Sequence, residues 1–162
     1  AAIDLFLRCF EQAWADDVTS DHRTAVIHSQ FVRRDQLEKY RDWGIIPSFY
    51  TEHTYFFGST HVANRGAEQA AFLSPMRTAL DMGIRCSNHT DFSVCPMDPM
   101  RVLWSSVTRQ SREGAVIGPS ERVERWEGLK ALTINAAWQI REEDQKGVLD
   151  PEDQAHRRRA SG

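Results

Sequence analysis

Three side chains that can bind a metal ion each follow a short apolar segment of the chain. These residues are His28, His53 and Asp91. Two neutral imidazoles and one carboxylate suit zinc or a similar divalent cation. A water molecule bound to such an ion has a pKa of about 7 and becomes a hydroxide nucleophile, and a neighbouring carboxylate can carry its proton. If the three residues converge, they therefore suit a metal site with a bound water molecule that could act as a nucleophile.

Spacing alone does not name a reaction, because a single histidine at a strand end is more often structural than a metal ligand. Three further residues lie near the candidate ligands and are weaker candidates for substrate binding: His61, Arg65 and His89. His22 precedes the first apolar run, and we expect it to lie on the surface. The prediction of a metal site rests on the joint placement of the three candidate ligands. The weaker candidates concern substrate binding beside that site.

Short apolar runs alternate with helical patterns along the chain, which is typical of βαβ units around a parallel sheet. Because parallel strands end at one edge, the polar side chains at their ends should meet there. We expect an irregular stretch over 56–66 and a loop over 114–123. The expected strands are 24–28, 45–50 and 84–88, and the expected helices are 1–16, 33–43, 67–72, 75–82, 99–111 and 127–142.

Several local signals define the expected helix ends and faces. Gly44 and Gly83 are placed to end helices in the left-handed conformation. Ser74 is expected to cap a helix that begins at Pro75. In the helix that starts at Pro99, we expect an inward face made of Met100, Leu103, Trp104 and Val107.

The composition is that of an ordinary globular domain. The chain has 162 residues, 41% of them hydrophobic, and a net charge of −3 that argues against nucleic acid as the main partner. No apolar run approaches the ~20 residues that span a bilayer, so no membrane partner is expected. The three cysteines form no CxxC motif, and a reducing cytoplasm is the simplest setting.

Five segments give the chain a resemblance to the amidohydrolase superfamily, in particular its amidohydrolase-3 group, which includes formamide deformylases. The similar segments occur in the family's order along the chain: 22–30, 44–53, 88–92, 131–137 and 146–151. The resemblance implies an α/β fold, namely part of a (β/α)8 TIM-type barrel. It implies that the chain carries about strands 5–8, with His28 ending strand 5, His53 ending strand 6 and Asp91 ending strand 8. Strand 7 is expected at Ala71–Leu73.

The resemblance also implies a mechanism. His28 and His53 would ligate a divalent metal, with zinc the leading candidate. Asp91 would ligate the metal and shuttle the proton. Hydroxide would then attack the carbonyl of a linear amide or formamide, which gives a carboxylate and an amine.

Two departures from the family pattern define the expected organisation. The His-x-His motif of strand 1 is not in this chain, and residues 151–162 abandon the family's pattern. We therefore expect residues 1–150 to be the C-terminal half of the barrel, incomplete at both ends, and 151–162 to be a disordered tail. The alternatives are a hydrolase fragment inactive alone, a non-catalytic remnant with weak metal binding, and a dimer of halves. Open barrel edges also predict self-association.

Overall fold

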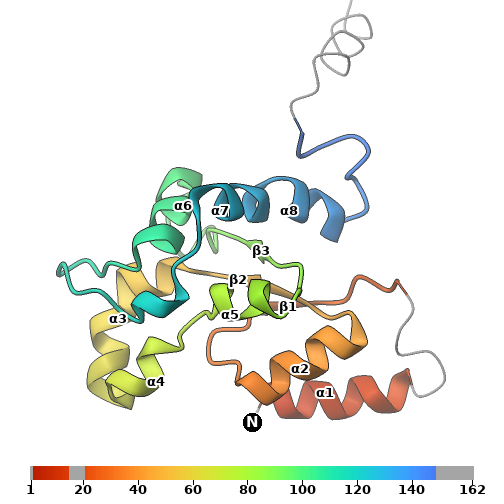
Figure 1. Ribbon diagram of the computed structural model, residues 1–162, viewed down its shortest axis with the longest axis horizontal. Coiled ribbons are helices and arrows are strands. Elements are labelled where there is room, and N and C mark those ends of the chain that lie inside the picture. The colour runs from red at the N-terminus through yellow and green to blue at the C-terminus, as the bar shows by residue number, and fades with distance from the viewer. Residues whose placement is uncertain (1, 15–20, 149–162) are drawn as a thin grey trace, which may run out of the picture.

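Three short parallel strands form the centre of the molecule (Figure 1). The computed structural model describes residues 2–14 and 21–148. Strand β1 (Ala25–His28) pairs with β2 (Ile46–Phe49), and β2 pairs with β3 (Ser87–Asn88). Because all three strands run in one direction, their carboxyl ends meet along one edge of the sheet. The predicted α/β class with a parallel sheet is confirmed, and the predicted tail lies outside the described residues.

The predicted strand at Ala71–Leu73 is wrong. Ala71 ends a helix, and Phe72 and Leu73 lie in the turn after it. Strand β2 instead pairs directly with β3, with Ser48 opposite Ser87. The three strands are therefore immediate neighbours, and the assignment of β2 and β3 to strands 6 and 8, with a strand between them, is also wrong.

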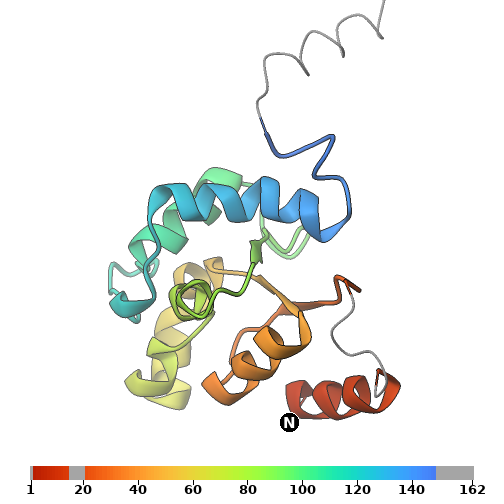
Figure 2. The ribbon, with the colours of Figure 1, turned by 45° about the vertical axis from the view of Figure 1, so that its right-hand side comes forward.

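The helices lie on both sides of this sheet. Figures 1 and 2 show α1 and α2 on one side, with α6, α7 and α8 on the other, where α7 and α8 contact β3. None of the described helices is both long and apolar enough to cross a membrane. The helices are α1 (Ala2–Ala13), α2 (Arg34–Trp43), α3 (Glu52–Arg65), α4 (Ala67–Ala71), α5 (Met76–Asp81), α6 (Pro99–Thr108), α7 (Arg125–Leu132) and α8 (Ile134–Gln139), with a 3-10 turn η1 (Pro119–Glu121) before α7.

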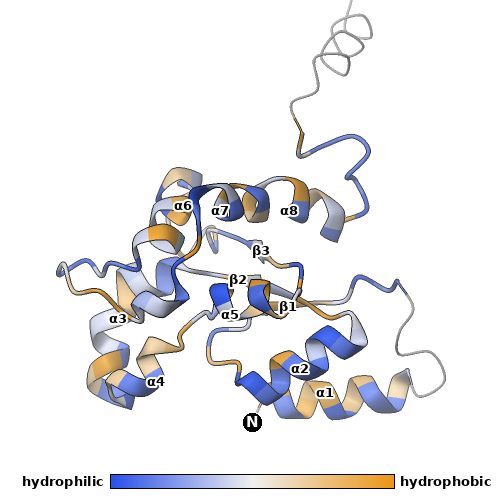
Figure 3. Cartoon of the chain, in the orientation of Figure 1, coloured by the Kyte–Doolittle hydropathy of each residue, from blue (hydrophilic) through white to orange (hydrophobic). Residues whose placement is uncertain are grey.

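The unit from α2 to β2 agrees closely with the sequence prediction. Helix α2 buries Leu37 and Tyr40, and it ends at Gly44, whose φ is +66°. Glycine adopts this left-handed conformation without the steric penalty of a Cβ. The chain then enters β2, which is buried along its whole length. The same core takes in the apolar face of α1, along which hydrophobic and hydrophilic residues alternate (Figure 3).

The expected irregular stretch over 56–66 is wrong, because this segment belongs to helix α3. Gly58 lies inside the helix, where it weakened the sequence signal. A Cβ at Gly58 would lie 2.9 Å from the Ile117 side chain. Glycine is thus required by the close approach of a neighbouring segment and does not break the helix.

Helix α6 begins at Pro99 as predicted but buries a different face. Met100 is 70% exposed and Trp104 is 39% exposed, while Val102, Ser105 and Ser106 face inward. The serine hydroxyls can be buried because each donates a hydrogen bond to a carbonyl one turn earlier in the helix. Leu103 and Val107 are half-buried, so the predicted inward face is wrong at Met100 and Trp104 and correct in part at the other two positions.

Two other predicted helix features differ in the structure. The expected helix over 127–142 is divided into α7 and α8 at Thr133, whose φ and ψ of −121° and −94° are not helical. Ser74 does not cap α5; its hydroxyl donates to the carbonyl of Tyr50 at 3.3 Å, and the helix begins at Met76. A tertiary hydrogen bond thus replaces the local cap at Ser74.

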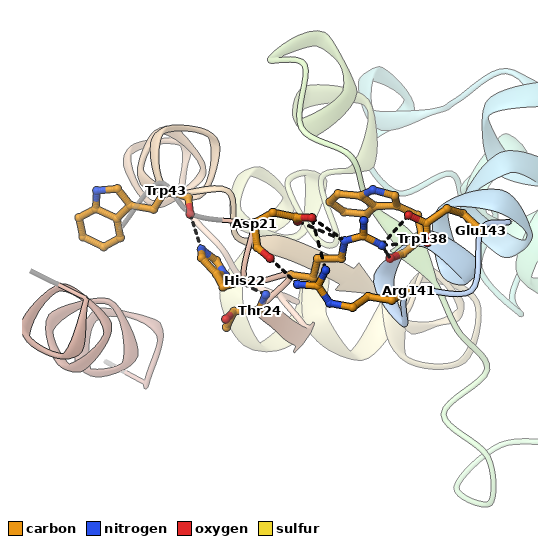
Figure 4. A network of polar contacts seen from close by, with 8 residues as sticks. Asp21, His22, Thr24, Trp43, Trp138, Arg141 and Glu143 are labelled. Carbon is orange, nitrogen blue, oxygen red and sulfur yellow. Dashed lines mark hydrogen bonds and ion pairs between the residues drawn. The ribbon is translucent and has the colours of Figure 1, made fainter. Parts of the chain in front are cut away.

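The amino end of β1 is tied to the segment around α8 by a polar network (Figure 4). Arg23 donates to Asp21 at 3.1 Å, to Glu143 at 2.8 Å and to the carbonyl of Trp138. Its guanidinium lies 4.6 Å from the centre of the Trp138 ring, and Arg141 donates to the carbonyl of Asp21. This network joins residues about 120 positions apart and fastens the first strand to the last helix.

His22 is part of the same end of the sheet and is not the surface group expected from sequence. Its ring is half-buried, and Nε2 lies 2.8 Å from the carbonyl of Trp43. The backbone N–H of Thr24 donates to His22 Nδ1 at 2.9 Å. Both ring nitrogens therefore have structural partners, which makes His22 a packing residue (Figure 4).

Candidate metal centre at the carboxyl ends of the strands

The structure brings the three predicted ligands together at the carboxyl edge of the sheet. His28 is the last residue of β1, His53 lies in the first turn of α3, and Asp91 lies just after β3. His28 Nε2 lies 3.3 Å from Asp91 Oδ1. The ring centres of His28 and His53 are 5.4 Å apart. Residues separated by up to 63 positions thus share one site.

The backbone is strained at two of these three residues. His28 has a φ of +67° and Asp91 a φ of +54°, in the left-handed region that residues with a Cβ rarely adopt. Each such residue costs about 1 kcal/mol or more and tends to occur where function requires it. A backbone hydrogen bond stabilises the chain next to each of these residues. Near His28, the N–H of Ser29 donates to the carbonyl of Ile27, and near Asp91, the N–H of Val94 donates to the carbonyl of Asp91. The strain turns both side chains away from the direction of a regular strand.

Four buried polar side-chain atoms at this edge have no hydrogen-bond partner. They are the Tyr50 hydroxyl, Glu52 Oε2, His53 Nδ1 and His89 Nε2. Within the described residues, no other buried side-chain nitrogen or oxygen lacks a partner. Leaving a buried polar atom unpaired costs about 1–3 kcal/mol, so native proteins rarely keep such atoms without a use. Their concentration at one edge identifies it as the candidate site.

The electrostatic environment favours the neutral form of two imidazoles at the site, His53 and His89. Burial, with a contribution from His28, lowers the pKa of His53 to about 3. Burial and His28 also lower the pKa of His89. A neutral imidazole retains a nitrogen lone pair and can therefore bind a metal ion.

The hydrogen atom on His89 can be assigned from its neighbour. The backbone N–H of Asp91 donates to His89 Nδ1 at 3.1 Å, so Nδ1 is the acceptor nitrogen of the neutral ring. The hydrogen then resides on Nε2, which has no acceptor. His89 therefore offers an N–H donor at the site, with its ring 5.0 Å from that of His28.

Tyr50 belongs to the site, although the sequence indicated only an apolar strand residue. Its ring centre lies 4.3 Å from that of His53 and 5.6 Å from that of His89. Burial, reinforced by Cys95, raises the pKa of the Tyr50 hydroxyl, which keeps its proton. A buried tyrosine normally pairs its hydroxyl, and no signal in the sequence marks this one as unpaired.

Glu52 is a second residue that sequence reasoning missed. It is fully buried, and its Oε1 accepts a hydrogen bond from Arg101 Nε at 2.8 Å. Burial raises the pKa of the Glu52 carboxyl, and Arg101 opposes this change. The sequence signal that could have identified Glu52 is its position: it is an acidic residue directly before His53, in a polar cluster that follows a strand. The pair links the helix that carries His53 to α6.

The weaker candidates divide into two groups. His89 lies within the site, and His61 lies beside it, with its ring centre 6.4 Å from that of His53 and its Nε2 2.8 Å from Gln30 Nε2. Arg65 instead places its guanidinium 4.1 Å from the centre of the Phe31 ring and lines an open groove of about 890 Å³. None of the three predicted ligands lines that groove, so the groove and the candidate ligands lie apart.

The donor set suits a divalent metal but does not surround one. Within residues 2–14 and 21–148, no three His, Cys, Asp or Glu side chains are arranged to hold one ion. The chemistry nevertheless fits, because His28 and Asp91 are in contact and His53 has an unpaired nitrogen in the same cluster. Zinc uses three or four such ligands. His28, His53 and Asp91 are therefore the residues that could hold a metal here.

Comparisons with known proteins agree with this chemistry. The chain is 31% identical over 139 residues to N-substituted formamide deformylase of Arthrobacter pascens, which covers 84% of this chain and 25% of that protein. The crystal structure of an uncharacterized metal-dependent hydrolase from Pyrococcus furiosus matches with a TM-score of 0.72 at 26% identity, over 91% of this chain and 28% of that one. A second one, from Pyrococcus horikoshii OT3, shares the fold at a TM-score of 0.73 and 18% identity, over 93% and 29%.

This chain thus spans about a quarter of the length of the proteins that it matches. The family model for the amidohydrolase family matches residues 1–156. The match includes the two candidate histidines, Asp91 and every element that positions them. The chain belongs to the amidohydrolase family.

Proposed function

We propose that this chain carries part of the active site of a metal-dependent hydrolase that cleaves linear amide or formamide C–N bonds. The observation that carries the proposal is that Tyr50, His53 and His89, whose rings lie beside that of His28, each have a buried polar atom without a partner, while His28 is in contact with Asp91. The similarity to N-substituted formamide deformylase supports the substrate class. His28, His53 and Asp91 are the proposed ligands, and zinc is the proposed metal.

A bound divalent ion would lower the pKa of a water molecule and polarise the substrate carbonyl. The protein groups then act around that centre. His28 and His53 provide imidazole nitrogens as metal ligands. Asp91 accepts a proton from the attacking water and passes it to the leaving nitrogen, so the products are a carboxylate and an amine. The unpaired Nε2–H of His89 and the Tyr50 hydroxyl are donors suited to hold the substrate oxygen.

The activity of the whole protein extends beyond this chain. The chain covers about a quarter of its deformylase relative, and the family resemblance implies a His-x-His pair from another strand as further ligands. We propose that residues 1–150 hold one metal ion through His28, His53 and Asp91 and need that partner region for full activity. Cytoplasmic location stays a prediction, as does the division at residue 150.

Self-association through the open sheet is a related proposal. Strand β1 pairs with β2 on one side, and within the described residues no strand pairs with its other edge. Ile27 on β1 is 54% exposed. An open edge with apolar side chains favours pairing with another chain. Size-exclusion chromatography with light scattering tests this, and a monomer at micromolar concentration would contradict it.

A second candidate function is a non-catalytic remnant of such a hydrolase that binds metal weakly. The observation that favours it is the lack of a converged three-ligand group among the described residues. It differs from the first proposal in its expected metal content. The remnant would hold a metal ion only at a small fraction of one ion per chain.

The test is elemental analysis of the purified chain, compared with a double variant, His28→Ala with His53→Ala. We expect close to one zinc per chain in the wild type and none in the double variant. His22→Gln is the matched control, because it removes an imidazole whose partners lie at the other end of the sheet. Metal in the wild type that persists in the double variant would refute the ligand assignment. No metal in the wild type would favour the remnant.

A further inference from the structure

A buried hydroxyl joins the ends of two strands to a helix directly behind the candidate site. Thr51 lies just after β2 and is fully buried. Its Oγ1 accepts a hydrogen bond from Asn88 Nδ2 at 2.8 Å and lies 2.8 Å from the Ser105 hydroxyl. The Thr51 hydroxyl also donates to the carbonyl of Val102 at 3.2 Å. One oxygen thus connects β2, β3 and α6.

The same pair of residues is joined by a second bond. The backbone N–H of Thr51 donates to Asn88 Oδ1 at 3.2 Å, so the Asn88 amide uses both of its ends on Thr51. The regular pairing of β2 and β3 stops at Phe49 and Asn88. The Asn88 side chain therefore continues the connection between the two strands beyond the last paired residues.

This connection lies immediately before two imidazoles of the candidate site. Thr51 stands two residues before His53, and Asn88 stands directly before His89. Both imidazoles have an unpaired nitrogen, so no hydrogen bond at that atom sets the orientation of either ring. The His89 ring is held at its other nitrogen by the backbone N–H of Asp91, so the placement of both rings depends on the backbone around them.

We propose that Thr51 is a positioning residue for the metal site: its hydroxyl, through Asn88 and Ser105, sets the separation of the backbones that carry His53 and His89. The proposal rests on the proposed function, because it assigns Thr51 a role in metal binding. Residues behind the ligands orient them, and changing such residues commonly costs about 10- to 100-fold in metal affinity.

Thr78 provides a matched control within the same chain. It is also buried, and its hydroxyl donates to Glu121 Oε1 at 2.6 Å. This bond joins α5 to η1, and none of its residues is a candidate ligand. Replacing either threonine by valine removes one buried hydroxyl and keeps the shape of the side chain. The two variants therefore differ in where the hydroxyl is lost.

The experiment measures the zinc affinity of the 162-residue chain by competition with a chromophoric chelator, beside thermal unfolding. We expect Thr51→Val to weaken zinc binding by about 10- to 100-fold. Thr51→Ser, which keeps the hydroxyl, should bind as the wild type does. Thr78→Val should lower the melting temperature and leave zinc affinity unchanged. Wild-type affinity in Thr51→Val would overturn the proposal.

A second readout separates this proposal from the proposed function. If the wild-type chain binds no zinc, the proposed function fails for this chain, and the imidazole NMR signals of the zinc-free protein decide the positioning role. Thr51→Val should shift the signals of both His53 and His89, whereas Thr78→Val should shift neither. Unshifted signals in Thr51→Val would refute positioning. If Thr51→Val does not fold, Ser105→Ala replaces it, with the same expected direction and the same refuting outcome.

Discussion

The two ends of the parallel sheet use polar side chains in opposite ways. At the amino end, Arg23, Asp21 and Glu143 form ion pairs and hydrogen bonds with one another (Figure 4). At the carboxyl end, four buried polar atoms have no partner, and His28 and Asp91 have strained backbones. The comparison teaches that polar groups at the amino end satisfy one another and stabilise the fold, while those at the carboxyl end are left unpaired at a cost in stability, as the proposed function would require.

The largest expected effect tests the carboxyl end directly. Asp91→Asn removes the proposed proton carrier but keeps the size of the side chain and tolerance of a positive φ. We expect the rate of formamide hydrolysis by the metal-loaded protein to fall by about 10²- to 10⁴-fold. Asp21→Asn, at the amino end, is the control and should leave the rate unchanged. A rate in Asp91→Asn close to that of the wild type would contradict the assigned role.

A smaller effect compares two buried tyrosines. The Tyr50 hydroxyl has no partner, whereas the Tyr40 hydroxyl lies 3.4 Å from the Ser29 hydroxyl. Because an unpaired buried hydroxyl is costly, Tyr50→Phe should raise the free energy of unfolding by about 1 kcal/mol. Tyr40→Phe should lower it by about 0.5–1 kcal/mol. Urea unfolding of both variants measures the two changes in the free energy of unfolding. Changes of the same sign in both variants would contradict this prediction.

The smallest expected effect concerns pH at the amino end. The hydrogen bond from Arg23 lowers the pKa of Asp21 from its ordinary 3.8. A carboxyl whose pKa is lower in the folded state stabilises the fold above its unfolded pKa, and this contribution is lost as the pH falls toward the folded pKa.

The matching variant is Asp21→Asn. At about pH 6 the wild type should be the more stable protein, and the difference should shrink as the pH falls below the ordinary carboxyl pKa of 3.8 toward the lower pKa of Asp21 in the folded state. Urea unfolding across that range measures it. The effect is small because Asp21 is exposed to solvent, which screens the ion pair. A difference that grows toward low pH would show that Asp21 is not stabilising as an anion.

Much of the fold could be predicted because its signals are local. The run from Arg34 to Phe49 contains an amphipathic helix, a glycine in the left-handed conformation and an apolar strand, and the structure has all three. The α3 segment could not be predicted in this way. Gly58 is a weak helix former, and its presence depends on the approach of Ile117 from a distant loop.

The position of the candidate site was predictable, its surroundings were not, and the assignment of its residues as metal ligands stays a prediction. His28, His53 and Asp91 were identifiable because each lies at or just beyond a strand end, and parallel strands end at one edge. Tyr50 and Glu52 could not be assigned from the sequence, because only the packed structure shows which of their atoms lack partners. Arg65 was placed near the second histidine by its position in the chain, but α3 carries it to Phe31 instead.

The sequence by itself determined the βαβ order, the end of α2 at Gly44, the three candidate ligands and the family. Hydrophobic periodicity, residue type and motif order are properties of the sequence itself, so they can be identified without a structure. Only the tertiary structure decided that β2 and β3 are direct neighbours, that Thr51 connects them to α6, and that the unpaired atoms gather at one edge. These features depend on which segments meet across long separations, where contacts between side chains and the cost of unpaired polar groups determine the arrangement.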